Sequence, residues 1–236
     1  MNIALVLAGG SGVRAGQKVP KQFLTIYDTP IIVYTLKNIE NSGCFDAIYA
    51  VCSEGWKSFV ESYAEQYDIL TFKGTITGGK TRQESFYNGI QFLTERYNPD
   101  DIIFMTDGNR PLIPKRVFED SIEKALSCDC VLPLEPCYDS MYQANAENQK
   151  VIQSVNREEL FRGQAPETAK LSVIKEICDK AVHDALKDQT LTSLMLHYGM
   201  NVAFIPGSSK CFKITTADDF SIFKALLGED RIKSIK

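Results

Sequence analysis

The chain has 236 residues, of which 44% are hydrophobic and 24% are charged, and its formal net charge is −4. This composition is typical of a folded, soluble protein with a sizeable core, and the acidic balance argues against a surface built to bind nucleic acid. No apolar run approaches the roughly 18 residues of a membrane span, and the N-terminus lacks the basic flank and cleavage site of a signal peptide.

The cysteines and histidines limit the chemistry further. Seven cysteines are scattered along the chain without a C-x-x-C pair, a pattern more typical of reduced thiols than of a disulfide framework or a zinc site. The chain contains two histidines, so we do not expect a reaction that relies on a histidine base. We expect a cytoplasmic protein with no nucleic-acid partner and no membrane attachment.

Apolar runs alternate with helical patterns along the chain, which predicts a mostly parallel sheet covered by helices. Strands are expected at residues 3–7, 47–52, 69–72, 101–105, 130–134 and 202–205. Helices are expected at residues 30–39, 56–67, from the 78–85 segment to about 96, and at 117–126, 167–187 and 217–227.

Residues 136–155 interrupt this alternation. The segment is polar, with short alternating runs around 145–149, and this pattern predicts a β-hairpin or arm outside the sheet. The sequence contains no internal repeat and no linker long enough to separate two domains. We therefore expect residues 1–236 to form a single α/β domain with a projecting β-arm at 136–155.

Three glycines in four positions follow the first predicted strand, in LAGGSGVRAGQKVPKQ at residues 7–22. Glycines permit a tight turn and let backbone N–H groups approach phosphate oxygens, and Arg14 and Lys21 can add charged contacts. A plain tight turn is the alternative. The segment lacks the spacing of a P-loop. The spacing of its glycines is compatible with a dinucleotide-binding fingerprint, but Arg14 lies inside the turn, and Pro20-Lys21-Gln22 occupies the place where the helix of that fingerprint should run.

Two further loops fall at equivalent places in the predicted sheet. GGKTRQES at residues 78–85 precedes a helix, and TDGNRP at residues 106–111 follows the strand at 101–105. In a parallel sheet, ligands bind where loops meet at the carboxyl ends of the strands. The three loops therefore predict one site at this edge for an anionic ligand.

The opening segment resembles the signature of the sugar-type nucleotidyltransferases, and its PKQF ending resembles the cytidylyltransferases of the methylerythritol-phosphate and ribitol-phosphate group. The similarity continues in order through GGKTRQES, TDGNRP, NREELFRGQAPET and KCFKITTADDF. It implies a Rossmann-like, mostly parallel sheet and transfer of CMP from CTP to a polyol phosphate with release of pyrophosphate. The sequence AGG at residues 8–10, in place of AAG, and Trp56 favour the ribitol-phosphate branch, with methylerythritol phosphate as the alternative acceptor.

The resemblance also implies which residues bind CTP. The reaction joins two anions, so the site must neutralise charge and align the reactants. Arg14 and Lys21 would stabilise the triphosphate, and Lys213 would hold or activate the acceptor phosphate; these three are the expected catalytic residues. The nucleotide would be held by Ala8, Gly9, Gly10, Gly12, Gly79, Arg82 and Ser85.

For the acceptor half, the resemblance implies three further residues and a metal. Asp107 would lie near the ribose, the acceptor and a Mg²⁺ ion, with Arg110 supporting it. Arg157, beyond the arm, would reach the acceptor phosphate across the interface of a homodimer formed through the arm. Mg²⁺ is expected because the triphosphate carries too much charge beside an incoming phosphate.

Departures from the family pattern concentrate on the acceptor side. They leave the acceptor open, so a third polyol or sugar phosphate fits as well as ribitol or methylerythritol phosphate. They also favour, as an alternative, a nucleotide-binding regulator without catalysis. A dehydrogenase is a third interpretation, but the second predicted strand is followed by no acidic residue except Glu54, which counts against it. The altered positions are Thr106, Asp139, Ser140, Met141, Tyr142, Ala165, Glu167, Gln189, Thr190 and Cys211.

The candidate residues also have structural interpretations. Asp107 precedes a glycine and could cap a loop, and Arg82 could brace neighbouring loops. We expect Trp56 to pack at a helix start and Asp218 and Asp219 to cap the last helix. The remaining cations could be solvated surface residues, namely Lys21, Lys213 and Arg157.

Overall fold

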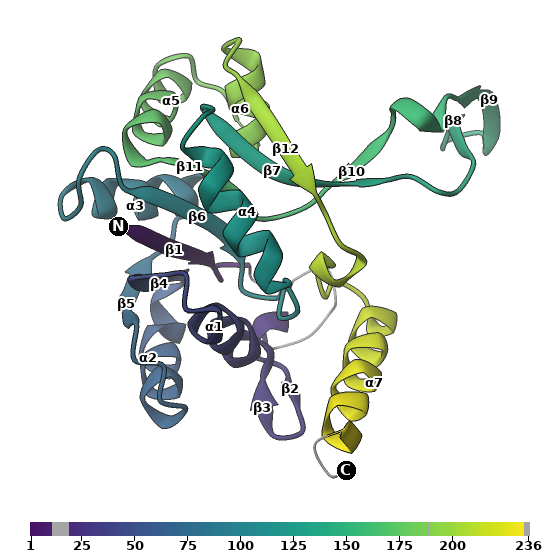
Figure 1. The fold of residues 1–236 in the computed structure, drawn as a ribbon. Helices are drawn as coiled ribbons and strands as arrows, with labels where there is room; N and C mark the ends of the chain where they lie inside the picture. The colour runs from purple at the N-terminus through teal and green to yellow at the C-terminus, as the bar shows by residue number, and fades with distance from the viewer. Residues whose placement is uncertain (11–18, 188, 234–236) are drawn as a thin grey trace.

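The computed structural model describes residues 1–10, 19–187 and 189–233 (Figure 1). Its centre is an eight-stranded sheet with the order β10-β7-β11-β6-β1-β4-β5, in which β12 also pairs with β7. The strands are β1 (Asn2–Leu7), β4 (Ala47–Cys52), β5 (Phe72–Thr77), β6 (Ile102–Asp107), β7 (Cys130–Pro136), β10 (Phe161–Gly163), β11 (Glu167–Lys170) and β12 (Val202–Pro206).

The middle of the sheet is parallel. Strand β1 runs parallel to β4 and β6, and β4 runs parallel to β5. Strands β10 and β11 are antiparallel to their neighbours. All six residues of β4 and of β6 are buried, as expected for strands covered on both faces.

Helices cover both faces of this sheet (Figure 1). One buried cluster joins β1 residues Ala4 and Val6 to α1 (Ile31–Ser42), α2 (Lys57–Gln66) and α4 (Lys115–Ala125). A second cluster joins Ile3 and Leu5 to the opposite set, α3 (Arg82–Thr94), α5 (Leu171–His183) and α6 (Leu191–His197). Alternate residues of one strand thus fill two cores, which is why β1 is apolar throughout.

The C-terminal helix α7 (Ala217–Lys233) packs on a small third cluster. This cluster includes Ile26 of the short hairpin formed by β2 (Thr25–Ile26) and β3 (Thr29–Pro30), and Phe223 of α7. Asp219 accepts hydrogen bonds from the backbone N–H groups of Thr215 and Thr216, at 2.8 and 2.7 Å. The predicted helix-capping role of Asp219 is confirmed.

Two predicted elements, one strand and one helix, are wrong. The third strand is Phe72–Thr77 instead of 69–72, because Ile69, three residues after α2, is buried in the first core cluster while Ile76 supplies the inward side chain of an edge strand. The helix predicted at 167–187 starts at Leu171, because Glu167–Lys170 pairs with β6 as a strand and tertiary pairing overrides local propensity. A separate helix, α6, follows α5.

The segment beyond β7 forms the predicted hairpin. Strands β8 (Met141–Asn145) and β9 (Lys150–Val155) pair with each other in a two-stranded sheet and extend away from the body of the molecule (Figure 1). The prediction of a mostly parallel α/β fold with a projecting β-arm is confirmed. Within the part of the chain described above, no helix combines the length and apolar character needed to cross a membrane.

Candidate active site

A cavity of about 510 Å³ opens at the carboxyl edge of the sheet. The three loops expected there all contribute to it, together with a 3₁₀ turn at Lys21–Phe23 and the segment before α7. The residues that line it are Leu7, Gly9, Gly10, Lys21, Gln22, Gly79, Lys80, Thr81, Arg82, Ser85, Asp107, Gly108, Asn109, Lys213 and Thr215.

The glycine loop after β1 is held by a side chain that the sequence-based prediction missed. The buried Gln22 amide donates to the carbonyl oxygens of Ala8 and Gly10, at 2.5 and 3.1 Å. These bonds place the neighbouring Lys21 at the cavity, where its Nζ donates to the Thr215 carbonyl. Lys21 therefore contacts the segment before α7 and is not simply a solvated side chain.

Two residues of the predicted phosphate-binding loop, Gly12 and Arg14, lie outside the described residues. The described part of the loop approaches α3 closely. A Cβ at Gly9 would lie 3.2 Å from the Ser85 hydroxyl, so this approach favours glycine.

The loop before α3 is ordered by its own side chains. Thr81 caps the helix by accepting from the N–H of Glu84 at 3.0 Å. The Glu84 side chain in turn accepts from the N–H of Lys80, the residue before the cap, at 2.7 Å. Ser85 accepts from the N–H of Gly79 at 3.0 Å. A Cβ at Gly79 would lie 2.2 Å from the Cβ of Glu84, so glycine is required there.

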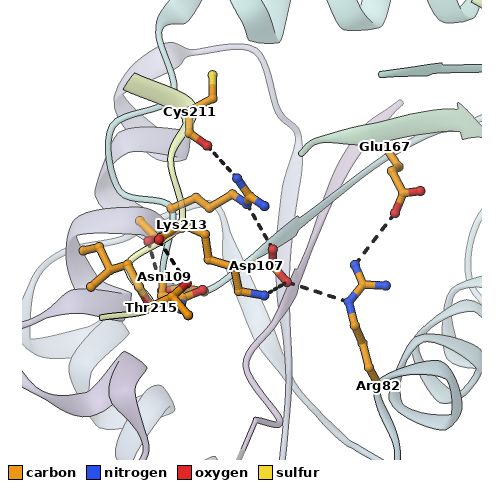
Figure 2. Close-up of polar contacts among 11 residues, drawn as sticks. Arg82, Asp107, Asn109, Glu167, Cys211, Lys213 and Thr215 are labelled. Carbon is orange, nitrogen blue, oxygen red and sulfur yellow. Dashed lines mark hydrogen bonds and ion pairs between the residues drawn. The ribbon is translucent and has the colours of Figure 1, made fainter. Parts of the chain in front are cut away.

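Asp107, at the end of β6, is the electrostatic centre of the site (Figure 2). Its Oδ1 lies 3.1 Å from Nζ of Lys213, and its Oδ2 accepts from Nε of Arg110 at 3.0 Å. Nε of Arg82 lies 3.8 Å from Oδ1. The side chain of Asp107 is 9% exposed, so three cations converge on one buried carboxylate.

These neighbours set the ionisation of Asp107. Burial alone would raise the pKa of its carboxyl, since water no longer solvates the charge. The three cations, of which Lys213 contributes most, outweigh burial and hold the pKa of Asp107 below its ordinary value. Asp107 is therefore ionised at neutral pH and serves as an anchor for basic side chains.

Backbone contacts bring Lys213 to this centre from far along the chain. Asn109 donates its amide to the Ile214 carbonyl at 2.6 Å, and the N–H of Ile214 donates back to the carbonyl of Asn109 at 3.0 Å. Arg110 donates to the carbonyl of Cys211 at 2.6 Å (Figure 2). The loop after β6 thus fixes the segment that carries Lys213.

The contact between Arg110 and Cys211 explains why the family pattern can change at position 211. The bond to Arg110 uses the backbone of Cys211, so it does not depend on that side chain. The thiol is fully buried, and burial raises the pKa of Cys211 to about 11. Cys211 is therefore a neutral packing residue beside the site.

Other departures occupy structural positions around the cavity. Thr190 caps α6 by accepting from the N–H of Ser193 at 3.1 Å. Glu167 is buried at the start of β11, where it lies 3.7 Å from Arg82 (Figure 2). Arg82 thus pairs with two carboxylates in addition to lining the cavity.

Arg157 stands apart from the other predicted residues. It lies in the 3₁₀ turn Arg157–Glu159 after the arm and is exposed, and it donates to the carbonyl of Tyr138 at 2.6 Å. It is not among the residues that line the cavity. Trp56, by contrast, packs at the start of α2 as expected, with its ring stacked on Phe23 at 4.1 Å between centroids.

A mostly parallel sheet, a glycine loop, and basic side chains gathered around one carboxylate are the arrangement expected of an enzyme that transfers a nucleotidyl group between phosphates. The chain belongs to the family described as 2-C-methyl-D-erythritol 4-phosphate cytidylyltransferase, whose model matches residues 2–229. The family predicted from the sequence motifs is confirmed.

Individual relatives agree with this assignment. The ribitol-5-phosphate cytidylyltransferase of Lacticaseibacillus paracasei is 33% identical over 235 residues, which covers 98% of this chain and 100% of that protein. The ribitol-5-phosphate cytidylyltransferase of Vibrio parahaemolyticus is 34% identical over 230 residues, or 96% of each chain. The structure of 4-diphosphocytidyl-2C-methyl-D-erythritol synthase from Anaerococcus prevotii has a TM-score of 0.81 at 19% identity, covering 97% of this chain and 98% of its own, and shows the same fold.

Proposed function

We propose that this protein transfers CMP from CTP to a polyol phosphate, with ribitol 5-phosphate as the first acceptor to test. The observation that carries the proposal is the convergence of Lys213, Arg110 and Arg82 on Asp107 in a cavity that Lys21 also lines. The relatives named above favour ribitol 5-phosphate, whereas the family description favours methylerythritol phosphate as the second candidate.

In the proposed reaction, an oxygen of the acceptor phosphate forms a bond to the α-phosphorus of CTP. The bond from that phosphorus to its bridging oxygen breaks, and pyrophosphate leaves with the electron pair. The attacking phosphate is already ionised at neutral pH, so no histidine base is needed. Catalysis then depends on charge neutralisation and alignment.

Lys21 and Lys213 have distinct proposed roles. Lys21, now bonded to the Thr215 carbonyl, would exchange that carbonyl for triphosphate oxygens and stabilise the leaving pyrophosphate. Lys213, fixed by Asp107, would hold the acceptor phosphate beside the α-phosphorus. The proposed contacts of Gly12 and Arg14 with the triphosphate are supported by the sequence motif alone.

We propose Mg²⁺ as the metal of the reaction. The described residues contain no group of three His, Cys, Asp or Glu side chains able to hold a metal, and both oxygens of Asp107 face cations. This donor set fits an ion carried mainly by the triphosphate, since Mg²⁺ commonly binds phosphates, waters and one carboxylate. Bound there, Mg²⁺ would screen phosphate charge, with Asp107 offering one oxygen.

We further propose a cytoplasmic homodimer formed through the β8–β9 arm, with no nucleic-acid or membrane partner. The arm exposes apolar side chains that a second copy could cover, namely Tyr138, Met141, Tyr142, Val151 and Ile152, and such patches mark interfaces. Arg157 at the base of the arm would then reach the acceptor phosphate of the partner subunit. Light scattering tests this directly, and a monomer would contradict the role of Arg157.

A pyrophosphate-release screen tests the proposed function. CTP, ATP, GTP and UTP are each combined with Mg²⁺ and with ribitol, glycerol, erythritol or methylerythritol phosphate. We expect release with CTP and ribitol 5-phosphate. If CTP binds but no polyol phosphate is converted, the non-catalytic regulator is the better interpretation. The acceptor found also decides between a role in surface polymers and one in isoprenoid synthesis.

A further inference from the structure

Glu167 lies on the same face of the sheet as Asp107 and faces the same arginine. In the antiparallel pairing of β11 with β6, Glu167 is opposite Met105, two residues before Asp107. Opposite residues share a face, and so do residues two apart on one strand. Helix α3 covers this face, and its first residue is Arg82. The guanidinium therefore lies between two buried carboxylates (Figure 2).

The two oxygens of Glu167 have different surroundings. Oε1 accepts from the backbone N–H of Thr192 at 2.7 Å, which fixes the carboxylate. Oε2 lies 3.7 Å from Nη2 of Arg82, close enough for an ion pair but too far for a hydrogen bond. Oε2 of Glu167 is a strong acceptor and Nη2 of Arg82 is a strong donor, so the two face each other without a direct hydrogen bond. Arg82 also lies 3.8 Å from Asp107.

A hydroxyl group would close the gap between Glu167 and Arg82. It could donate to Oε2 of Glu167 at about 2.7 Å and accept from Nη2 of Arg82 at about 2.9 Å. Those two lengths form a triangle whose base is the observed 3.7 Å separation. The carboxylate can only accept and the guanidinium can only donate, so the pair selects a group that does both.

The order of the strands indicates which ligand supplies the hydroxyl. The loops proposed to hold CTP follow β1 and β5, whereas β11 lies on the opposite side of β6. Within the sheet, Glu167 therefore lies on the far side of Asp107 from the glycine loop after β1. It is not itself among the cavity-lining residues, and it borders the cavity through Arg82, which lines it. This position is the half of the site away from the glycine loop. Under the proposed function, the molecule in that half is the acceptor.

We propose that Glu167 and Arg82 bind a chain hydroxyl of the polyol phosphate and so determine acceptor specificity, an inference that rests on the proposed function. It moves Arg82, expected from the sequence to hold the nucleotide, to the acceptor side of the site because of its pairing with Glu167. The family pattern has glutamine at position 167, and an amide can donate as well as accept. Glutamate makes this position an obligate, charged acceptor. An acceptor that places a methyl group or a hydrogen there would leave Oε2 of Glu167 without a hydrogen bond and bind less well.

The test compares Glu167→Gln with the wild type, using ribitol 5-phosphate and its 2-, 3- and 4-deoxy analogues at saturating CTP and Mg²⁺. In the wild type, we expect removal of one particular hydroxyl to lower kcat/KM about 30-fold. In Glu167→Gln, which can still accept from Thr192, that penalty should fall to about threefold while the penalties at the other positions stay unchanged. Glu176→Gln, on the exposed face of α5, is the matched control and should behave as the wild type.

The outcomes separate the two proposals. If the wild type converts ribitol 5-phosphate but no deoxy analogue shows a penalty that depends on Glu167, the hydroxyl site is wrong. If instead the Glu167-dependent penalty appears with 2′-deoxy-CTP or 3′-deoxy-CTP, the hydroxyl belongs to the nucleotide and the acceptor assignment is wrong.

If the wild type converts no ribitol 5-phosphate, the proposed acceptor fails. The same phosphates are then compared by the shift in melting temperature that each causes with CTP present. A Glu167-dependent loss of that shift for one deoxy analogue supports the hydroxyl site independently of turnover, and equal shifts for all analogues overturn it.

Discussion

Replacing Asp107 by asparagine tests whether this carboxylate is the anchor of the basic cluster. The substitution keeps the shape of the side chain but leaves Lys213, Arg110 and Arg82 without their shared negative partner. Of these three, Arg110 is the most buried, with a side chain 15% exposed against 41% and 42% for the other two. Most of the lost stability should therefore come from the Arg110 pair.

The expected loss follows from these exposures. Breaking a charge-assisted bond in which both groups are largely buried costs about 2 kcal/mol, and the two half-exposed partners add at most about 0.5 kcal/mol each because water screens them. The free energy of unfolding should fall by about 2–3 kcal/mol at pH 7. For a chain of this length, that corresponds to a drop in melting temperature of about 5–10 °C.

The loss should also depend on pH. The folded-state pKa of Asp107 lies below its ordinary value of 3.8, so its contribution to stability is fully present above that value and disappears as the pH falls through the folded-state pKa. Urea unfolding of both proteins at pH 7, 5 and 4 and below measures this. Equal stabilities at pH 7, or a difference that persists undiminished in acid, would refute the anchor role.

Three further predictions concern neighbouring residues. Gly79→Ala should weaken CTP binding at least tenfold in calorimetric titrations, because the new Cβ would collide with Glu84; unchanged affinity would contradict this. Gln22→Ala removes two buried hydrogen bonds to the glycine loop and should lower kcat/KM for CTP about tenfold, with little effect on the KM of the acceptor. Cys211 is fully buried with a raised pKa, so iodoacetamide at pH 8 should label it far more slowly than the half-buried Cys44, as followed by mass spectrometry.

The parts of the fold that the sequence predicted best are those where local pattern and tertiary environment agree. The buried run of β1 and the alternating run of the β8–β9 arm are unambiguous in the sequence. Strand β11 is not, because Glu167–Lys170 has no strand pattern and becomes a strand only through its pairing with β6. Edge strand β5 was misplaced because a single inward isoleucine, Ile76, gives little apolar signal.

The candidate site shows a similar division. Motif order was enough to select Lys21, Asp107 and Lys213, which the structure brings to one cavity. The supporting contacts depend on long-range geometry, since the Gln22 amide and the Arg110 guanidinium both bond to backbone carbonyls that no motif identifies. The pairing of Glu167 with Arg82 could not be read from the sequence, because it depends on the register of β11 on β6.

The central claim is that this cavity transfers CMP, with Lys21 stabilising the triphosphate as it reacts. Phosphorus NMR of wild-type protein, Lys21→Ala and the exposed-surface control Lys124→Ala, each mixed with CTP, Mg²⁺ and ribitol 5-phosphate, tests it most directly. We expect CDP-ribitol and pyrophosphate to form in equal amounts with the wild type and the control, and product formation by Lys21→Ala to be at least a hundredfold slower. Product formation by Lys21→Ala at the wild-type rate, or hydrolysis of CTP without a CDP-alcohol product, would contradict the claim.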